Sequence, residues 1–144
     1  MPTPQSFQNH AKYVPGYHWV TFGLILVLLA WSVSLLVRHP SLAGVMQLIT
    51  ALVLGMTAFY ARVFGVGAQD RVIRLEEQLR MARVLPDDLK ARVGELRLAQ
   101  FVALRFAPDA ELPGLVRRVL GGELPTQRAI KEAIKDWRPD YERV

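Results

Sequence analysis

Histidine and cysteine, the side chains most used for catalysis and metal binding, are scarce in this sequence. There is no cysteine, and the three histidines are His10, His18 and His39. None of them lies three or four residues from another histidine or from a carboxylate, the spacing that places two ligands on one face of a helix. The lack of cysteine excludes a disulfide framework, a thiolate zinc site and a cysteine nucleophile. The sequence therefore predicts a protein that is not an enzyme, with no catalytic residue, metal site or cofactor.

Asp87 and Asp88 resemble a metal-binding pair, but no third ligand lies nearby in the sequence. They follow Pro86, and a proline followed by acids is typical of the first turn of a helix, where the helix dipole favours negative charge. We therefore interpret them as a helix start. Other acids precede an arginine by four residues and are predicted to form ion pairs within one helix, namely Asp70–Arg74 and Glu76–Arg80.

The candidate partner-binding residues are basic and aromatic side chains in the second half of the chain: Arg105, Arg117, Arg118, Lys131, Lys135 and Trp137. Lys131 and Lys135 share a helical face, but a nucleic-acid surface needs a larger cluster of positive charge. Arg105 has a structural alternative, an ion pair with Asp109 or Glu111. The partners we expect are the lipid bilayer and either another protein or a second copy of the chain. We do not expect nucleic acid, and no small-molecule substrate is inferred.

Charge is distributed very unevenly along the chain. Residues 1–61 contain two basic residues, Lys12 and Arg38, and no acid. Residues 62–144 carry the rest of the 18 lysines and arginines and all 13 acids. This division predicts an apolar part in lipid and a charged part in water.

Two uncharged runs, residues 17–37 and 42–61, are predicted to be transmembrane helices. The first, at 1.5 Å per residue, spans about 30 Å, the thickness of a hydrocarbon core. Pro40 in the short link disfavours helix at His39, so the two spans should be antiparallel neighbours. Small residues four apart should allow their backbones to approach closely, at Ala30 and Ser34 in the first span and at Ala51 and Gly55 in the second.

The arginines set the expected orientation. The link offers only Arg38, whereas five arginines lie in the 22 residues after the second span: Arg62, Arg71, Arg74, Arg80 and Arg83. Positive charge stays on the cytoplasmic side, so both termini should be cytoplasmic in a bacterial inner membrane, with residues 1–16 as an N-terminal arm. The alternative is a cleaved signal peptide ending near Ser32-Val33-Ser34, although the apolar run continues beyond that point.

Residues 62–68 are predicted to be a hinge, because Gly65 and Gly67 weaken a helix there. Residues 69–144 should form a cytoplasmic helical domain. Its first helix carries an apolar stripe that we expect to pack on the rest of that domain, with a second copy of the chain as the alternative: Val72, Leu75, Leu79 and Ala82. Fewer than three heptads fit, so the sequence does not demonstrate a self-standing coiled coil.

Further short helices are predicted in this domain. Residues 97–107 are apolar nearly all round and should lie at the centre of a core. Asp109 should cap a helix over 110–120 that ends at Gly121-Gly122. Thr126 should begin a last helix that ends before Pro139, with its apolar stripe formed by Ile130, Ala133, Ile134 and Trp137.

Several motifs resemble a family of small bacterial two-span membrane proteins known only as a domain of unknown function. They are Gln8–Pro15, Gln69–Glu77, Ala103–Ala107 and Ile130–Tyr141, so the resemblance runs nearly from end to end. It implies the architecture and a bacterial origin, and it implies no chemistry. The Gly65-Val66-Gly67 stretch departs from the family pattern.

The sequence thus predicts an all-α protein, in which a two-helix transmembrane hairpin is followed by a small cytoplasmic bundle of short helices. The function that fits best is that of a structural or accessory protein whose cytoplasmic domain mediates protein–protein interaction or self-association. Two alternatives remain. One is a membrane-tethered binder of anionic lipid or nucleic acid, and the other is a holin-like pore or lesion former.

Overall fold

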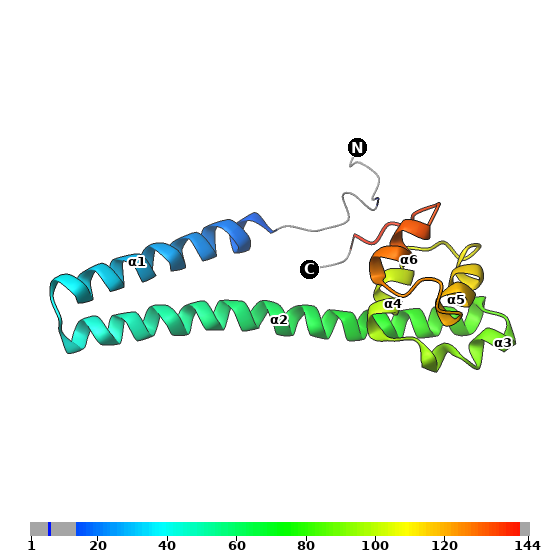
Figure 1. Cartoon of the computed structure of the whole chain (residues 1–144), viewed down its shortest axis with the longest axis horizontal. Helices are drawn as coiled ribbons and strands as arrows, with labels where there is room; N and C mark the ends of the chain where they lie inside the picture. Colours follow the sequence, from blue (N-terminus) through cyan, green and yellow to red (C-terminus); the bar gives the residue numbers. More distant parts are fainter. Residues whose placement is uncertain (1–5, 7–13, 142–144) are drawn as a thin grey trace. The chain divides into compact units, whose positions relative to one another are not determined.

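A computed structural model describes Ser6 and residues 14–141, and it contains helices and no strand in that part of the chain. The all-α prediction is therefore confirmed. The chain divides between Val66 and Gly67 into two compact units. Most of the expected N-terminal arm lies outside the described residues. In chain order the elements are η1 Gly16–Thr21, α1 Phe22–Arg38, α2 Leu42–Val84, α3 Asp87–Lys90, η2 Val93–Glu95, α4 Leu98–Leu104, α5 Leu112–Leu120 and α6 Gln127–Ala133 (Figure 1).

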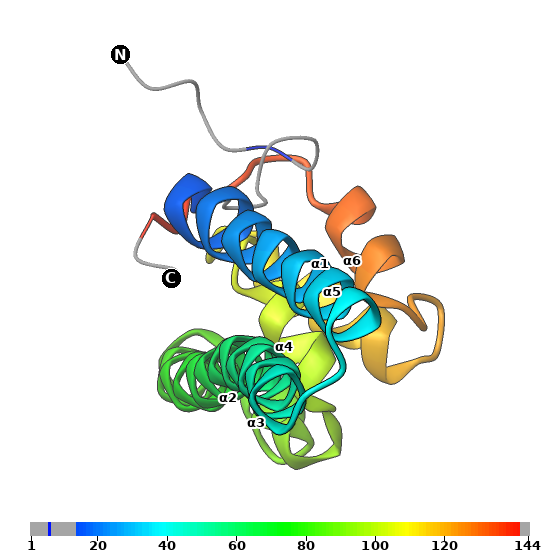
Figure 2. The ribbon, with the colours of Figure 1, turned by 90° about the vertical axis from the view of Figure 1, so that its left-hand side faces the viewer.

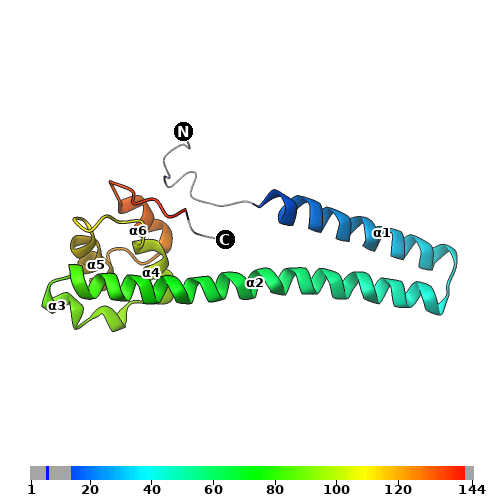
Figure 3. The same ribbon diagram turned by 180° about the vertical axis from the view of Figure 1, so that it is seen from behind.

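In the first unit, α1 and the first part of α2 run antiparallel (Figures 1 and 3). α1 ends at Arg38, two residues before Pro40, and α2 begins after Ser41, whose hydroxyl oxygen accepts the N–H of Gly44 at 3.1 Å. A Cβ atom added to Gly44 would lie 3.3 Å from Leu36 Cδ1, so the two helices approach closely beside the turn. At the other end, the hydroxyl of Tyr17 donates to the carbonyl of Ala58.

Small residues line the contact between these two helices, but not all of those expected. Ala51 is buried, and a Cβ atom at Gly55 would lie 3.5 Å from Ile25 Cγ2, so both face α1. On α1 the buried small residue is Ser32, whereas Ala30 is exposed. The hydroxyl of Ser32 donates to the carbonyl of Leu28 at 2.7 Å, which satisfies it within its own helix.

Two helices of the described chain are long and apolar enough to cross a membrane, Gly16–Arg38 and Leu42–Val84. The second continues well beyond Ala61, so residues 62–68, the predicted hinge, are helical. Gly65 and Gly67 both have helical rather than positive φ, and the space where a Cβ atom would lie is open at each. A glycine costs about 1 kcal/mol in a helix, which is too little to interrupt one as long as Leu42–Val84.

The second unit has a core built around α4, as expected for a helix that is apolar nearly all round. Phe101 and Leu104 of α4, together with Phe106, are almost completely buried. Side chains from α2, α5 and α6 complete the core, including Met81, Leu112, Val116 and Ile130. Figure 2 looks along α2 and shows α4 next to it, with α5 and α6 farther from its axis.

Local signals fix several helix ends in this unit. α3 begins at Asp87, directly after Pro86, as predicted. α6 begins directly after Thr126, as predicted, and the side chain of Thr126 accepts the N–H of Ala129 at 3.1 Å and caps the helix. α5 ends at Leu120, and Gly122 follows with φ of 81°, a conformation that glycine adopts without strain.

Two helix boundaries differ from the prediction. Asp109 does not cap α5, which begins at Leu112, because its carboxylate is bound by Arg80. The last helix ends at Ala133, so Trp137 lies beyond it. The Glu111 carboxylate accepts the N–H groups of Lys135 and Asp136, at 3.0 Å each, and holds that segment in a non-helical path.

Candidate interaction site

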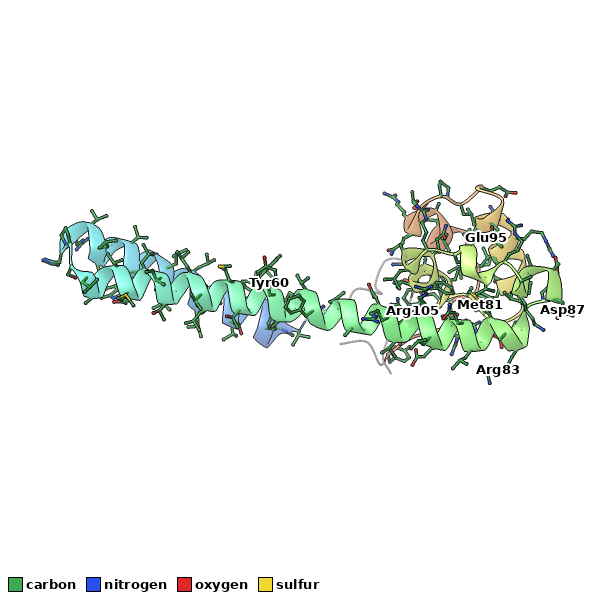
Figure 4. All side chains as sticks on the ribbon, turned by 90° about the horizontal axis from the view of Figure 1, so that it is seen from below. Tyr60, Met81, Arg83, Asp87, Glu95 and Arg105 are labelled. Carbon is green, nitrogen blue, oxygen red and sulfur yellow. The ribbon has the colours of Figure 1, made fainter. Side chains whose placement is uncertain are left out.

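The C-terminal part of α2 presents two opposite faces. One is buried in the second unit and consists of Ile73, Glu77, Arg80, Met81 and Leu85. The other carries the apolar stripe. Figure 4 shows the difference at two labelled residues, since Met81 points into the helical cluster and Arg83 points away from it.

The buried face contains an ion cluster centred on Arg80. Its guanidinium donates to Glu77 Oε2 at 3.0 Å and to Asp109 Oδ1 at 2.6 Å. It also donates to the carbonyl oxygen of Ala107 at 2.6 Å. A buried charge is tolerated only when it is paired and hydrogen-bonded, and Arg80 meets both conditions. The cluster therefore fixes the orientation of α2 in its unit, with residues 77 and 80 inward.

Glu77 is the second member of this cluster. Its Oε1 atom lies 3.6 Å from Nη1 of Arg138, and its side chain is 5% exposed. Burial raises the pKa of Glu77 above its ordinary value, and the nearby Arg80 and Arg138 only partly oppose that rise. The predicted ion pairs Asp70–Arg74 and Glu76–Arg80 do not form among the described residues. Arg80 turns inward to Glu77 and Asp109, and the Arg74 guanidinium lies 5.8 Å from the centre of the Phe101 ring.

A cavity of about 560 Å³ lies beside the cluster and is bordered by four arginines, Arg80, Arg83, Arg105 and Arg138. Glu76, Glu77 and Asp140 also line it, so its charge is nearly balanced. Arg80, Arg105 and Arg138 each already lie beside a carboxylate. The cavity thus has the character of a structural ion network rather than of an anion-binding pocket. Within the described residues no group of three or more potential metal ligands comes together.

The opposite face of α2 leaves large apolar side chains uncovered. Val72 is 53% exposed, Leu75 is 61% exposed and Leu79 is 68% exposed. The prediction that this stripe packs on its own unit is therefore wrong, because the bundle covers the other face of the helix. A contiguous apolar surface on a folded helical unit is typical of an interaction site.

Three of the predicted partner-binding residues are brought together around Phe106. The guanidinium of Arg105 lies 4.1 Å from the centre of the Phe106 ring, and Nζ of Lys131 lies 5.5 Å from it. The ring of Trp137 is 4.7 Å from the same ring. Arg105 is 5% exposed and donates to Asp140 at 2.8 Å, rather than to the expected Asp109 or Glu111. Arg105 and Trp137 are therefore positioned to hold the C-terminal segment in place.

The other predicted residues lie near acids. Arg117 lies 3.6 Å from Asp88, and Arg118 lies 3.0 Å from Glu123. Lys135 is exposed, and its backbone N–H is bound by Glu111. The basic residues of α5 thus each have an acidic neighbour, which lowers the local positive charge.

Sequence reasoning missed the Glu77–Arg80 cluster. Ile73, Glu77, Arg80 and Met81 have helical spacing, but charges in the middle of a face normally indicate that it is exposed. The signal that would have reversed this interpretation is the pairing with Asp109 and Arg138, which are distant in the sequence.

These features define an all-helical protein with two candidate membrane helices and a second, ion-paired helical unit that exposes an apolar stripe. The chain belongs to the Family of unknown function (DUF6526), whose model matches residues 1–144. This confirms the resemblance to a family without an assigned activity. No curated protein and no solved structure matches the chain significantly.

Proposed function

We propose that this chain is a non-enzymatic accessory protein of the bacterial inner membrane, whose second helical unit binds a protein partner at the cytoplasmic surface. The observation that carries this proposal is the exposed stripe of Val72, Leu75 and Leu79 on a helix whose other face is buried. Leaving three large apolar side chains in water is unfavourable by roughly 1 kcal/mol or more for each, and a partner that covers them removes that cost.

The first unit is suited to lipid. Large apolar side chains point outward along both helices, for example Leu24 at 64% exposure, Val37 at 76% and Leu52 at 49%. A hydroxyl on the exposed surface of this unit is satisfied within its own helix, since Thr50 donates to the carbonyl of Met46 at 2.9 Å. A surface of this kind is stable in a bilayer, where no water satisfies polar groups.

The expected orientation follows from the arginines. Arg38 stands alone in the turn between the two helices, whereas Arg62, Arg71 and Arg74 follow the apolar part of α2. The positive-inside rule then places the second unit, and both termini, in the cytoplasm. We assign no catalytic residue, because Arg80, Arg105 and Arg138 beside the cavity are used in ion pairs that join parts of the fold.

Membrane location and orientation are tested together. Carbonate extraction should leave the chain in the membrane fraction, and a periplasmic phosphatase fused after Val144 should be inactive. Extraction into the soluble fraction, or an active phosphatase, would contradict the proposal.

The interaction is tested by purification in mild detergent followed by mass spectrometry. The variant Leu75→Glu/Leu79→Glu should lose the partner that copurifies with the natural chain, whether that partner is another protein or a differently tagged second copy of the chain. Leu98→Glu is a matched control, because Leu98 is a partly exposed leucine outside the stripe. Equal recovery of every protein with both variants would remove the stripe as the binding site.

A further inference from the structure

The stripe on α2 has the spacing of a coiled-coil seam. Ala68, Val72, Leu75, Leu79 and Ala82 follow one another at alternating steps of four and three residues, and all five are exposed. In heptad notation Val72 and Leu79 are at a, and Leu75 is at d. Among these positions, Val72 at a with Leu75 at d is the combination that favours two strands, whereas Leu79 at a and the alanines at d are neutral to that choice.

We propose that a second copy of this chain covers the stripe, so that two α2 helices form a short parallel coiled coil over residues 68–82. This inference rests on the proposed membrane location and names the partner of the proposed interaction site. The occupant follows from the heptad spacing together with the charges that border the stripe.

Arg71 and Glu76 border the stripe on its two sides, at the g and e positions. Neither forms an ion pair within the described part of its own chain. In a parallel coiled coil, a g residue faces the e residue five positions later in the other helix. Arg71 of each copy would thus face Glu76 of the other, giving two complementary pairs across the seam.

The same charges disfavour an antiparallel pair. Centred on this stripe, an antiparallel arrangement places the e positions opposite each other, and the two Glu76 carboxylates then repel. Two chains inserted in one membrane with the same orientation also have parallel α2 helices.

About two heptads are too few for a tight coiled coil in solution, because short helices gain little from association. Anchoring both copies in one bilayer raises their effective concentration, so that a weak contact becomes populated. The contact is therefore expected in the membrane-bound full chain.

Site-specific crosslinking tests this arrangement directly, because the natural chain has no cysteine. The variants Val72→Cys, Leu75→Cys and Leu79→Cys of the full chain are oxidised in native membranes. Ala99→Cys, at an exposed position of α4, is the control. We expect a disulfide-linked dimer at all three stripe positions and little at the control, because a parallel seam brings identical positions together. Crosslinking at only one stripe position, or equal crosslinking at Ala99→Cys, would overturn the proposal.

Charge reversal provides an independent test. Arg71→Glu and Glu76→Arg each turn both attractive pairs into repulsive ones, and each should weaken the dimer roughly tenfold in nanodiscs. The double variant Arg71→Glu/Glu76→Arg restores opposite charges and should recover most of that loss. Circular dichroism of each variant reports whether the helices remain intact. Single variants that dimerise like the natural chain, or a double variant as weak as the singles, would contradict the arrangement.

The proposed membrane location and the proposed dimer can be rejected independently of each other. Loss of the chain from carbonate-washed membranes would reject membrane anchoring. A chain that stays in those membranes but does not crosslink through the stripe would reject the dimer alone.

Discussion

Arg105 and Asp140 connect α4 to the C-terminal segment of the chain, with Nε of the arginine donating to Oδ2 of the aspartate at 2.8 Å. The same guanidinium donates to the carbonyl of Val102 at 2.8 Å and stacks over Phe106. One side chain thus joins the end of α4 to the C-terminal segment of the second unit. Because its charge is buried, its effect should be on stability rather than on affinity for a partner.

Arg105→Ala should therefore lower the free energy of unfolding by about 3 kcal/mol, since it leaves a partly buried carboxylate and a carbonyl without their donor. Arg118→Ala is the matched control, because its ion pair with Glu123 is solvent-exposed and should contribute within about 1 kcal/mol. Denaturant unfolding followed by circular dichroism measures both. Equal losses in the two variants would show that Arg105 has no special structural role.

Trp137→Ala should cost about 2 kcal/mol, below the range for a fully buried tryptophan, because the indole is half-buried against Phe106. Tyr141→Ala removes an aromatic ring of the same segment that is 58% exposed, and it should change stability little. Thermal unfolding of the full chain in detergent distinguishes these outcomes. A negligible effect of Trp137→Ala would instead support a role for this residue as a partner anchor.

The raised pKa of Glu77 predicts a specific pH dependence. The folded state binds the proton of the Glu77 carboxyl more tightly than the unfolded state does. The contribution of Glu77 to the free energy of unfolding is therefore most favourable below the ordinary glutamate pKa. It is lost as pH rises through the raised pKa. Relative to Glu77→Gln, the natural chain should lose stability as pH increases across that window.

Glu95 provides a control of opposite sign for this pH measurement. The hydrogen bond from Arg92 lowers the pKa of Glu95, so its contribution is present above the ordinary pKa and is lost as pH falls through the lowered one. Relative to Glu95→Gln, the natural chain should gain stability as pH rises. Unfolding curves at several pH values show how each stability difference changes with pH. A change of the same sign for both variants would refute the raised pKa of Glu77.

The continuity of α2 can be checked at its glycines. Gly65→Ala and Gly67→Ala should each raise helix stability by about 1 kcal/mol, because both positions are helical and have open space for a Cβ atom. Gly122→Ala should instead destabilise the chain by about 1 kcal/mol, because φ is 81° there. Destabilisation by the first two substitutions would indicate that residues 65 and 67 depart from the helix.

Binding to anionic surfaces should be weak. Arg117 and Arg118 lie beside Asp88 and Glu123, so the second unit offers few uncompensated cations near Lys131 and Lys135. At ~0.15 M salt, where charges are screened over about 8 Å, residues 67–144 should bind neither anionic vesicles nor duplex DNA appreciably. Vesicle flotation and gel shift test this. Tight binding that Lys131→Ala/Lys135→Ala abolishes would favour the membrane-tethered binder.

The sequence by itself determined the helical class, the two long apolar helices and several helix ends. These features depend on neighbours in the chain: an uncharged run, a proline after a helix, or a threonine whose side chain caps the next turn. Thr126 and Pro86 could be interpreted correctly for that reason. The central position of α4 was also predictable, because a helix that is apolar on nearly every side has no face suited to water.

The tertiary structure alone decided which face of α2 is buried. By periodicity, Val72, Leu75 and Leu79 form the more apolar stripe, whereas Glu77 and Arg80 mark a face that belongs in water. The fold buries that second face because Asp109 and Arg138, far away in the sequence, supply the opposite charges that Arg80 and Glu77 need. Pairing between distant residues offsets part of the burial cost, and no local pattern contains that information.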